Sequence, residues 1–112
     1  MSEIQGGGGP TPITPREQRM YEQEYKDGAK LFQKALEQYR KSDSIFQKHE
    51  FEEVMDKALN VLNQAANELK AKTLVEQNVK IKQDYQSFMK DPTNLAGANQ
   101  LQKDLDQAMK KV

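Results

Sequence analysis

Few side chains in this chain could carry out catalytic or metal chemistry. There is no cysteine and only one histidine, His49. This composition excludes disulfides, thiolate nucleophiles and, within one chain, any metal site built from several histidines or cysteines. The helical Glu-x-x-His metal motif needs a glutamate three residues before the histidine, and none precedes His49 at that spacing. We therefore expect no metal site and no cofactor.

Carboxylates and serines are the remaining candidates for chemistry. Carboxylates cluster at Glu50, Glu52 and Glu53, and again at Asp104 and Asp106. Ser42 and Ser44 lie near His49 in sequence. A nucleophilic site also needs a base aligned in space and a group that orients this base, which sequence proximity alone does not supply. We predict that the protein is not an enzyme and treat His49 as an exposed or corner residue.

The charge balance limits the classes of partner. The 112 residues include 17 basic and 17 acidic side chains, so the formal net charge is zero. Nucleic-acid binding requires a clear basic excess, so we expect no nucleic-acid partner. The mean hydropathy is −0.96, and no apolar run approaches the roughly 18 residues of a membrane span. The length suits one small domain.

The first 13 residues differ in composition from the rest. A run of four glycines, Gly6 to Gly9, precedes Pro10 and Pro12, which is typical of a disordered tail. No Gly-Lys-Ser/Thr pattern follows the glycines, so they do not indicate a phosphate loop. The segment lacks the apolar stretch of a secretory signal. We expect a cytoplasmic or other reducing compartment, with type III-like secretion left open.

The elements that would position these residues are predicted to be helices. Thr14, Pro15 and Glu17 form a capping box with a proline at the first helical position, which predicts a helix start. Apolar residues then recur at alternating steps of three and four, the spacing of a heptad seam. We predict an all-α fold of three or four amphipathic helices, in an up-and-down bundle or an elongated hairpin. The expected helices cover about 15–41, 44–72, 73–90 and 95–112, in one domain over 14–112.

The two internal breaks are less firmly indicated. Capping and turn residues occupy 42–44, but no proline or glycine forces a break, so a continuous helix is also compatible with 41–49. The seam slips near 70–74, which indicates a helix end or a change of face. Two seam positions are ambiguous. Gly28 allows a close helix approach or is a weak point, and Asn78 either sets the register when buried or faces solvent.

An aromatic stripe and two leucines are the candidate interface. Tyr21, Tyr25, Phe32 and Tyr39 share one helical face, while Leu101 and Leu105 lie on the face of the last helix. The aromatic stripe is either core or a half-exposed interface, because a tyrosine hydroxyl can remain hydrated at an interface. Leu, Ile, Val and Phe make up only about a fifth of the chain. A core this thin favours self-association or a helical partner.

The segment between the last two helices resembles a known family. Lys90-Asp91-Pro92-Thr93-Asn94 is similar to the turn of the helical hairpin in bacterial type III secretion needle subunits. Residues 102–105, Gln-Lys-Asp-Leu, fall where that family continues its second helix. The resemblance covers about 20 residues, and two further long helical segments precede it here. It implies an antiparallel hairpin and a role in a secretion apparatus.

Three functional hypotheses follow. The first is a non-catalytic protein–protein interaction or assembly module that acts by helix packing, because an unpaired seam recruits another helix. The second is a component or small chaperone of a bacterial secretion apparatus. The third is a binder of anionic membrane surfaces that uses the lysines of 70–112, a segment with mildly basic composition.

Overall fold

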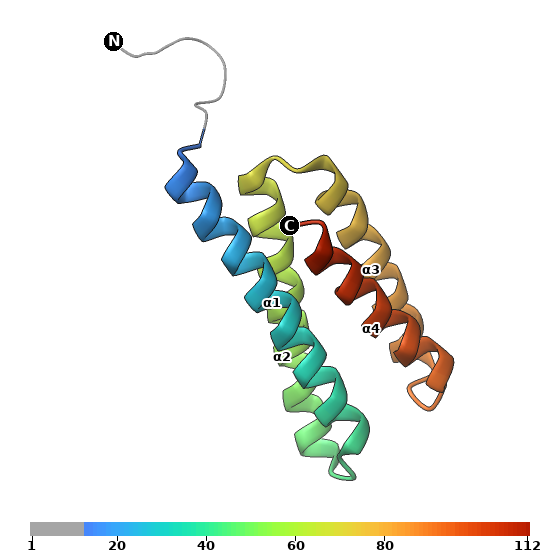
Figure 1. Ribbon diagram of the computed structural model, residues 1–112. Coiled ribbons are helices and arrows are strands. Elements are labelled where there is room, and N and C mark those ends of the chain that lie inside the picture. Colours follow the sequence, from blue (N-terminus) through green and yellow to red (C-terminus); the bar gives the residue numbers. More distant parts are fainter. Residues whose placement is uncertain (1–12) are drawn as a thin grey trace.

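The computed structural model describes residues 13–112, and these residues form four helices and no strand. The helices are α1 (Pro15–Lys41), α2 (Ile45–Leu69), α3 (Lys72–Lys90) and α4 (Leu95–Lys110). The all-α fold expected from the sequence is therefore confirmed (Figure 1). Except for Ile13, the expected disordered tail lies outside the described residues.

The first helix and the first break are set by side-chain caps. The Glu17 amide donates to Thr14 Oγ1 and the Thr14 amide donates to Glu17 Oε1, both at 3.1 Å, which completes the capping box. The chain leaves the helix at residues 42–44, and Ser44 Oγ then accepts from the Gln47 amide at 3.3 Å. Because the capping hydroxyl satisfies an otherwise unpaired amide, α2 starts anew here. A continuous helix through 41–49 is excluded.

The second break is sharper than the seam slip indicated. Helix α2 ends at Leu69, three residues before the expected boundary, because Lys70 adopts the left-handed conformation with φ of 53°. A left-handed residue after a helix redirects its amide and the next one to the last carbonyls, and the Ala71 amide donates to the Ala66 carbonyl at 3.2 Å. Helix α3 then begins at Lys72. At the other end, α4 stops at Lys110 and not at 112.

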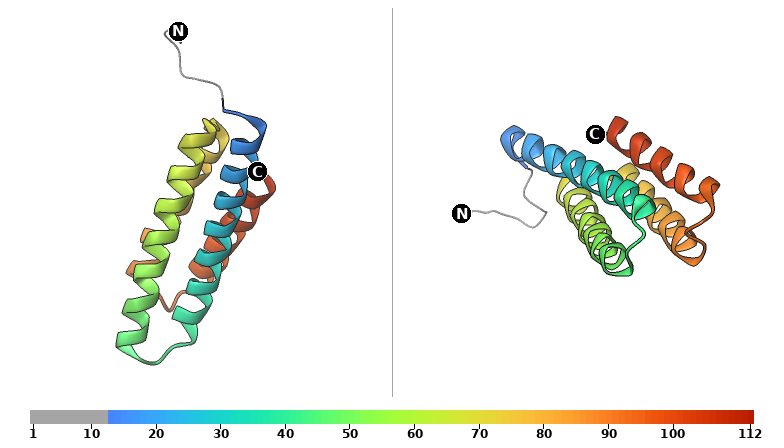
Figure 2. Two further views of the ribbon diagram at one scale, coloured as in Figure 1. Left: turned by 90° about the vertical axis from the view of Figure 1, so that its left-hand side faces the viewer. Right: turned by 90° about the horizontal axis from the view of Figure 1, so that it is seen from below.

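The helices form two antiparallel hairpins that pack against each other as an up-and-down bundle (Figures 1 and 2). Helix α1 contacts α2 and α4, and α3 contacts α2 and α4. Helices α1 and α2 have 27 and 25 residues, whereas α3 and α4 have 19 and 16. The turn between α1 and α2 therefore projects beyond the turn between α3 and α4 (Figure 1).

The core contains a close helix approach at a glycine and two aromatic pairs. Gly28 is buried where α1 meets α2, and a Cβ added to it would lie 3.0 Å from Val61 Cγ1. The close-approach interpretation of Gly28 is thus the correct one. Phe32 packs edge-on to Tyr85 at a centroid distance of 5.2 Å. Tyr39 and Phe88 form a second edge-on pair at 5.8 Å, so both pairs join α1 to α3.

Asn78 is buried and connects three helices. Its exposed fraction is 2%. The Tyr25 hydroxyl donates to Asn78 Oδ1 at 2.6 Å, and Asn78 Nδ2 donates to the Leu62 carbonyl at 3.0 Å. The solvent-facing interpretation is therefore wrong. A buried amide satisfied by both α1 and α2 fixes the register of α3 against the first hairpin.

Most of the candidate interface belongs to the core of the single chain. The buried members are Tyr25, Phe32, Tyr39, Leu101 and Leu105. Only Tyr21, near the start of α1, is half-buried. These five side chains are part of the buried core. They are not accessible from solvent unless the bundle opens.

Candidate functional site

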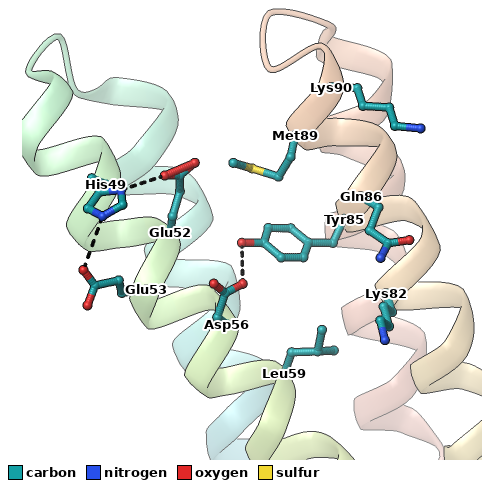
Figure 3. A pocket seen from close by; sticks show the side chains of 10 residues that line it. All are labelled: His49, Glu52, Glu53, Asp56, Leu59, Lys82, Tyr85, Gln86, Met89 and Lys90. Carbon is teal, nitrogen blue, oxygen red and sulfur yellow. Dashed lines mark hydrogen bonds and ion pairs between the residues drawn. The ribbon is translucent and has the colours of Figure 1, made fainter.

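A groove of about 740 Å³ lies between α2 and α3, near the end of the bundle where the hairpins turn (Figure 3). Helix α2 contributes His49, Glu52, Glu53, Asp56 and Leu59. Helix α3 contributes Lys82, Tyr85, Gln86, Met89 and Lys90. The groove is a surface feature that faces solvent, and the side chains of the two helices approach it from opposite sides.

The floor of the groove is largely apolar, and one hydrogen bond crosses it from α3 to α2. Leu59 and Tyr85 are 8% and 7% exposed, and Met89 is half-buried. The Tyr85 hydroxyl reaches across from α3 and donates to Asp56 Oδ1 on α2 at 2.9 Å. Burial, followed by the hydrogen bond to this carboxylate, raises the pKa of Tyr85 above its ordinary value. The hydroxyl therefore remains a proton donor at neutral pH.

The two walls of the groove carry opposite charge. On α2, Glu52, Glu53 and Asp56 follow His49 at three, four and seven residues, so these four side chains lie along one side of the helix. On α3, Lys82, Gln86 and Lys90 recur every four residues and form a basic and polar row. The apolar floor thus lies between an acidic wall and a basic wall.

The histidine and the carboxylates do come together here. His49 Nδ1 lies 3.4 Å from Glu52 Oε2, and its Nε2 lies 3.6 Å from Glu53 Oε1. The His49 and Glu53 side chains are 71% and 61% exposed, however. No serine or threonine lines the groove. Both contacts of the imidazole ring are open to water. The arrangement therefore lacks the enclosed, aligned nucleophile and base of a catalytic site.

Metal binding has no support within residues 13–112. No group of three or more His, Cys, Asp or Glu side chains in this part of the chain is arranged to hold a metal ion. Both nitrogens of His49 already face carboxylates. The groove offers an apolar surface with charged edges.

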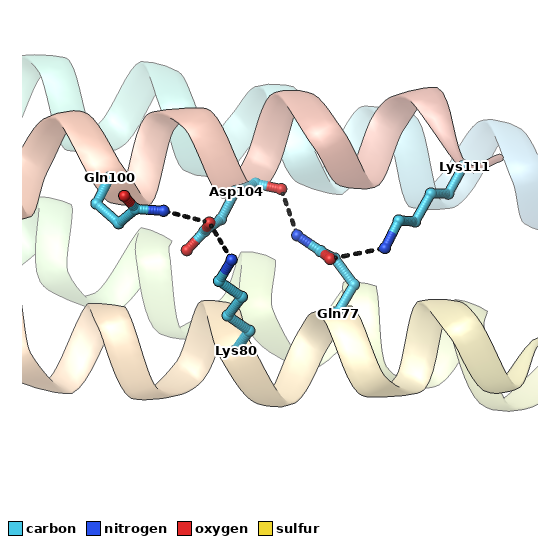
Figure 4. A network of polar contacts seen from close by, with 5 residues as sticks. All are labelled: Gln77, Lys80, Gln100, Asp104 and Lys111. Atoms are coloured by element: carbon cyan, nitrogen blue, oxygen red, sulfur yellow. Dashed lines mark hydrogen bonds and ion pairs between the residues drawn. The ribbon is translucent and has the colours of Figure 1, made fainter.

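A second polar cluster lies between α3 and α4 (Figure 4). The Asp104 side chain is completely buried and its Oδ1 accepts from Gln100 Nε2 at 2.9 Å. Lys80 Nζ lies 3.5 Å from the same oxygen. Gln77 Nε2 donates to the Asp104 carbonyl at 3.0 Å and Gln77 Oε1 accepts from Lys111 Nζ at 2.9 Å. These contacts tie α3 to α4 along their length.

Asp84 lies beside this cluster, and the Asp104 carboxylate influences its protonation. Each aspartate has one buried carboxylate oxygen, Oδ2, that lacks a hydrogen-bond partner. The hydrogen bond with Asp104, then burial and the negative charge of Asp104, raise the pKa of Asp84 from 3.8 to about 6, while Lys80 lowers it. A protonated Asp84 can donate to the Asp104 carboxylate, because a carboxylic acid carries a donor that a carboxylate accepts. We therefore expect the stability of this cluster to depend on pH.

Sequence reasoning pointed to only part of these two sites. The cluster Glu50, Glu52 and Glu53 was visible in the sequence, but Glu50 does not line the groove and Asp56 was not singled out. The pairing of the acidic row with the row Lys82–Lys90 depends on the packing of α2 against α3. Asp104 was noted among the carboxylates, whereas its burial and its partner Asp84 were missed. An aspartate that falls on the seam side of an otherwise apolar helix face was the available signal. The lysines of 70–112 do not form one patch, since Lys80 faces Asp104 and Lys82 lines the groove.

Comparisons with known proteins return no relative. No family model, no curated protein and no solved structure matches this chain. Among the described residues, no helix combines the length and the apolar character that crossing a bilayer requires.

Proposed function

We propose that this chain is a non-catalytic protein–protein interaction module that holds an amphipathic helix of its partner in the groove between α2 and α3. The observation that carries this proposal is the order of side chains across the groove. Leu59, Tyr85 and Met89 form an apolar strip, with acids on the α2 side and lysines on the α3 side. A partner helix needs an apolar stripe to cover the strip, and this is the helix-in-groove mode of recognition.

The charged walls define the flanks of the partner helix. Basic side chains are favoured on the flank that lies against Glu52 and Glu53, and acidic side chains on the flank that lies against Lys82 and Lys90. A helix with lysines on both flanks is attracted by α2 and repelled by α3. A helix with glutamates on both flanks is repelled by α2 and attracted by α3. Because reversing the direction of a helix exchanges its flanks, a helix with one basic and one acidic flank satisfies both walls in one of its two directions.

Designed helices of known sequence test the groove directly. Three synthetic amphipathic helices share one apolar stripe and carry mixed, all-lysine or all-glutamate flanks, and their affinities are measured by titration calorimetry. We expect the mixed-flank helix to bind about tenfold more tightly than either of the others, which corresponds to about 1.4 kcal/mol. Equal affinities for the three helices, or no binding of any of them, would contradict the proposal.

A charge reversal in the groove gives the matched control. Glu52→Lys with Glu53→Lys makes both walls basic, so the preferred helix is expected to change to the all-glutamate one. Glu24→Lys with Asp27→Lys reverses two exposed acids on α1, away from the groove, and is expected to leave the preference unchanged. His49→Ala in the same assay is expected to alter affinity only slightly, because the His49 side chain is largely exposed.

A narrower candidate is a component or small chaperone of a bacterial secretion apparatus. The observation that favours it is the antiparallel hairpin of α3 and α4 around the turn at 91–94, in the segment that resembles needle subunits. Chromatography with light scattering tests it in two steps. Filaments or defined oligomers of this chain support an assembly component, and a 1:1 complex with a purified needle subunit supports a chaperone. A monomer that ignores the needle subunit would exclude both.

A further inference from the structure

The turn between α1 and α2 presents two large apolar side chains to solvent. Ile45 and Phe46 are 83% and 85% exposed, the highest values among the large hydrophobic residues described. They occupy the first two positions of α2, directly after the Ser42–Ser44 turn. We define the apex as residues 40–48. Neither the bundle core nor the groove uses Phe46, so its exposure needs a separate explanation.

The apex is not obstructed by the second hairpin. The molecule measures 58 × 23 × 20 Å, and the apex lies at one end of the long axis, beyond the turn of the second hairpin (Figures 1 and 2). Side chains of a helix tilt toward its N-terminus, so those of the first turn of α2 lean toward the apex. The end of the hairpin can therefore enter a surface without a clash from α3 or α4.

The groove does not account for the two apex side chains. Successive helical residues point about 100° apart, so Ile45 lies on the side of α2 that carries His49 and Glu52. Phe46 lies near the side of Glu53. Neither Ile45 nor Phe46 lines the groove, so a helix confined to the groove does not cover them. Two side chains also fall far short of the roughly 800 Å² that each partner buries in a stable interface. A medium that surrounds the apex covers both.

The charges of the apex match an anionic surface. Arg40, Lys41 and Lys48 are basic, and Asp43 is the one acid among residues 40–48. Lys48 Nζ donates to the Tyr39 carbonyl at 2.9 Å and lies 4.4 Å from the Tyr39 ring centroid, so its position is fixed beside the turn. On α1, Glu37 lies 3.4 Å from Lys41 Nζ, and on α2 the acids begin in the next turn with Glu50, Glu52 and Glu53. Because anionic headgroups repel acidic side chains, this order of charges limits insertion to the first turn of α2.

We propose that the apex inserts Ile45 and Phe46 into the interface of an anionic lipid bilayer, with Arg40, Lys41 and Lys48 against the headgroups. This binding goes beyond helix recognition in the groove and uses different side chains. Two large apolar side chains combined with a few basic ones give the shallow, reversible binding of a peripheral protein.

A single tryptophan reports insertion, because the chain contains none. Phe46→Trp is titrated with vesicles of phosphatidylcholine alone and of phosphatidylcholine mixed with phosphatidylglycerol. We expect its emission to shift to shorter wavelength with the mixed vesicles, and the shift to shrink at high salt. Val79→Trp, at an exposed position on α3, is the matched control and is expected to show no shift.

Two further variants assign the contributions. Ile45→Ser with Phe46→Ser is expected to lower vesicle partitioning at least about tenfold without changing the circular dichroism, because both side chains are exposed. Arg40→Gln with Lys41→Gln is expected to lower it about fivefold per charge removed on mixed vesicles only. An unchanged Phe46→Trp emission overturns the proposal. A shift that grows with protein concentration in the absence of vesicles also overturns it, since the apex would then be a contact between copies.

Discussion

The two helices of the first hairpin and the two helices of the second are held together by different kinds of contact. Where α1 meets α2, Gly28 and small neighbours let the helices approach until only van der Waals contact separates them. Where α3 meets α4, Asp104 is fully buried and Gln77 and Lys80 bond to it across the interface. The first contact is apolar and independent of pH. The second depends on charge, so the stability of the two hairpins responds to different perturbations.

The largest effect is expected from a cavity on the apolar side. Leu62→Ala removes a fully buried side chain beside Gly28 and is expected to lower the free energy of unfolding by about 2–5 kcal/mol. Urea denaturation followed by circular dichroism measures this. Leu31→Ala, at a position that is 43% exposed on α1, is the control and is expected to change stability by less than about 0.5 kcal/mol.

The same measurement on the polar side sharpens the contrast. Asp104 is as fully buried as Leu62, yet replacing it with leucine removes a buried charge as well as its hydrogen bonds. We expect Asp104→Leu to stay within about 1 kcal/mol of the wild type at neutral pH, or to be more stable, because apolar residues often replace buried ionic groups without loss. A loss as large as that of Leu62→Ala would show that the polar cluster is as important as the apolar contact.

An intermediate effect is expected from filling the close approach at Gly28. Gly28→Val places atoms against Val61 Cγ1, which already lies 3.0 Å from the position of a Cβ. We expect a loss of about 1–3 kcal/mol from overpacking. Val61→Ala in the same chain makes room and is expected to restore part of this loss. If the two losses simply add, the two positions are not coupled.

The smallest effect is a pH dependence that belongs to the polar side. The pKa of Asp84 is raised from 3.8 to about 6 in the folded protein, so the folded state binds the proton more tightly than the unfolded state. The resulting stability is present in full below pH 3.8 and is lost as the pH rises through 6. Since Asp84 is partly exposed, we expect a difference of about 1 kcal/mol between pH 5 and pH 7.5.

The variant Asp84→Asn isolates this effect. In this variant the free energy of unfolding is expected to differ much less between pH 5 and pH 7.5 than in the wild type. Urea denaturation at the two pH values measures this. Asp27→Asn removes an exposed carboxylate on α1 and is expected to retain the wild-type difference. A wild-type protein that is more stable at pH 7.5 than at pH 5 would contradict the raised pKa of Asp84.

The helices were predictable from local patterns, whereas several boundaries were not. Thr14 and Ser44 cap helices by bonds to amides three residues away, so their roles are readable from sequence. The end of α2 was placed three residues too late. The left-handed turn at Lys70 uses no glycine, and a lysine gives no local signal for that conformation.

Burial was harder to predict than periodicity. The stripe Tyr25, Phe32 and Tyr39 was correctly seen as one face, but the pattern left core and interface as alternatives. The pattern could not show that α3 supplies Tyr85 and Phe88 as edge-on partners. Asn78 was equally ambiguous, because its burial depends on Tyr25 and Leu62, which lie on two other helices.

The sequence by itself determined the elements of this protein, because capping and the three-four spacing of apolar residues act within a few residues of one chain segment. It also determined the absence of cysteine and the single histidine, which limit the chemistry. Only the tertiary structure decided which rows of side chains face one another. The acidic row of α2 meets the basic row of α3, and Asp84 meets Asp104, because two antiparallel hairpins bring together residues that are far apart in the chain.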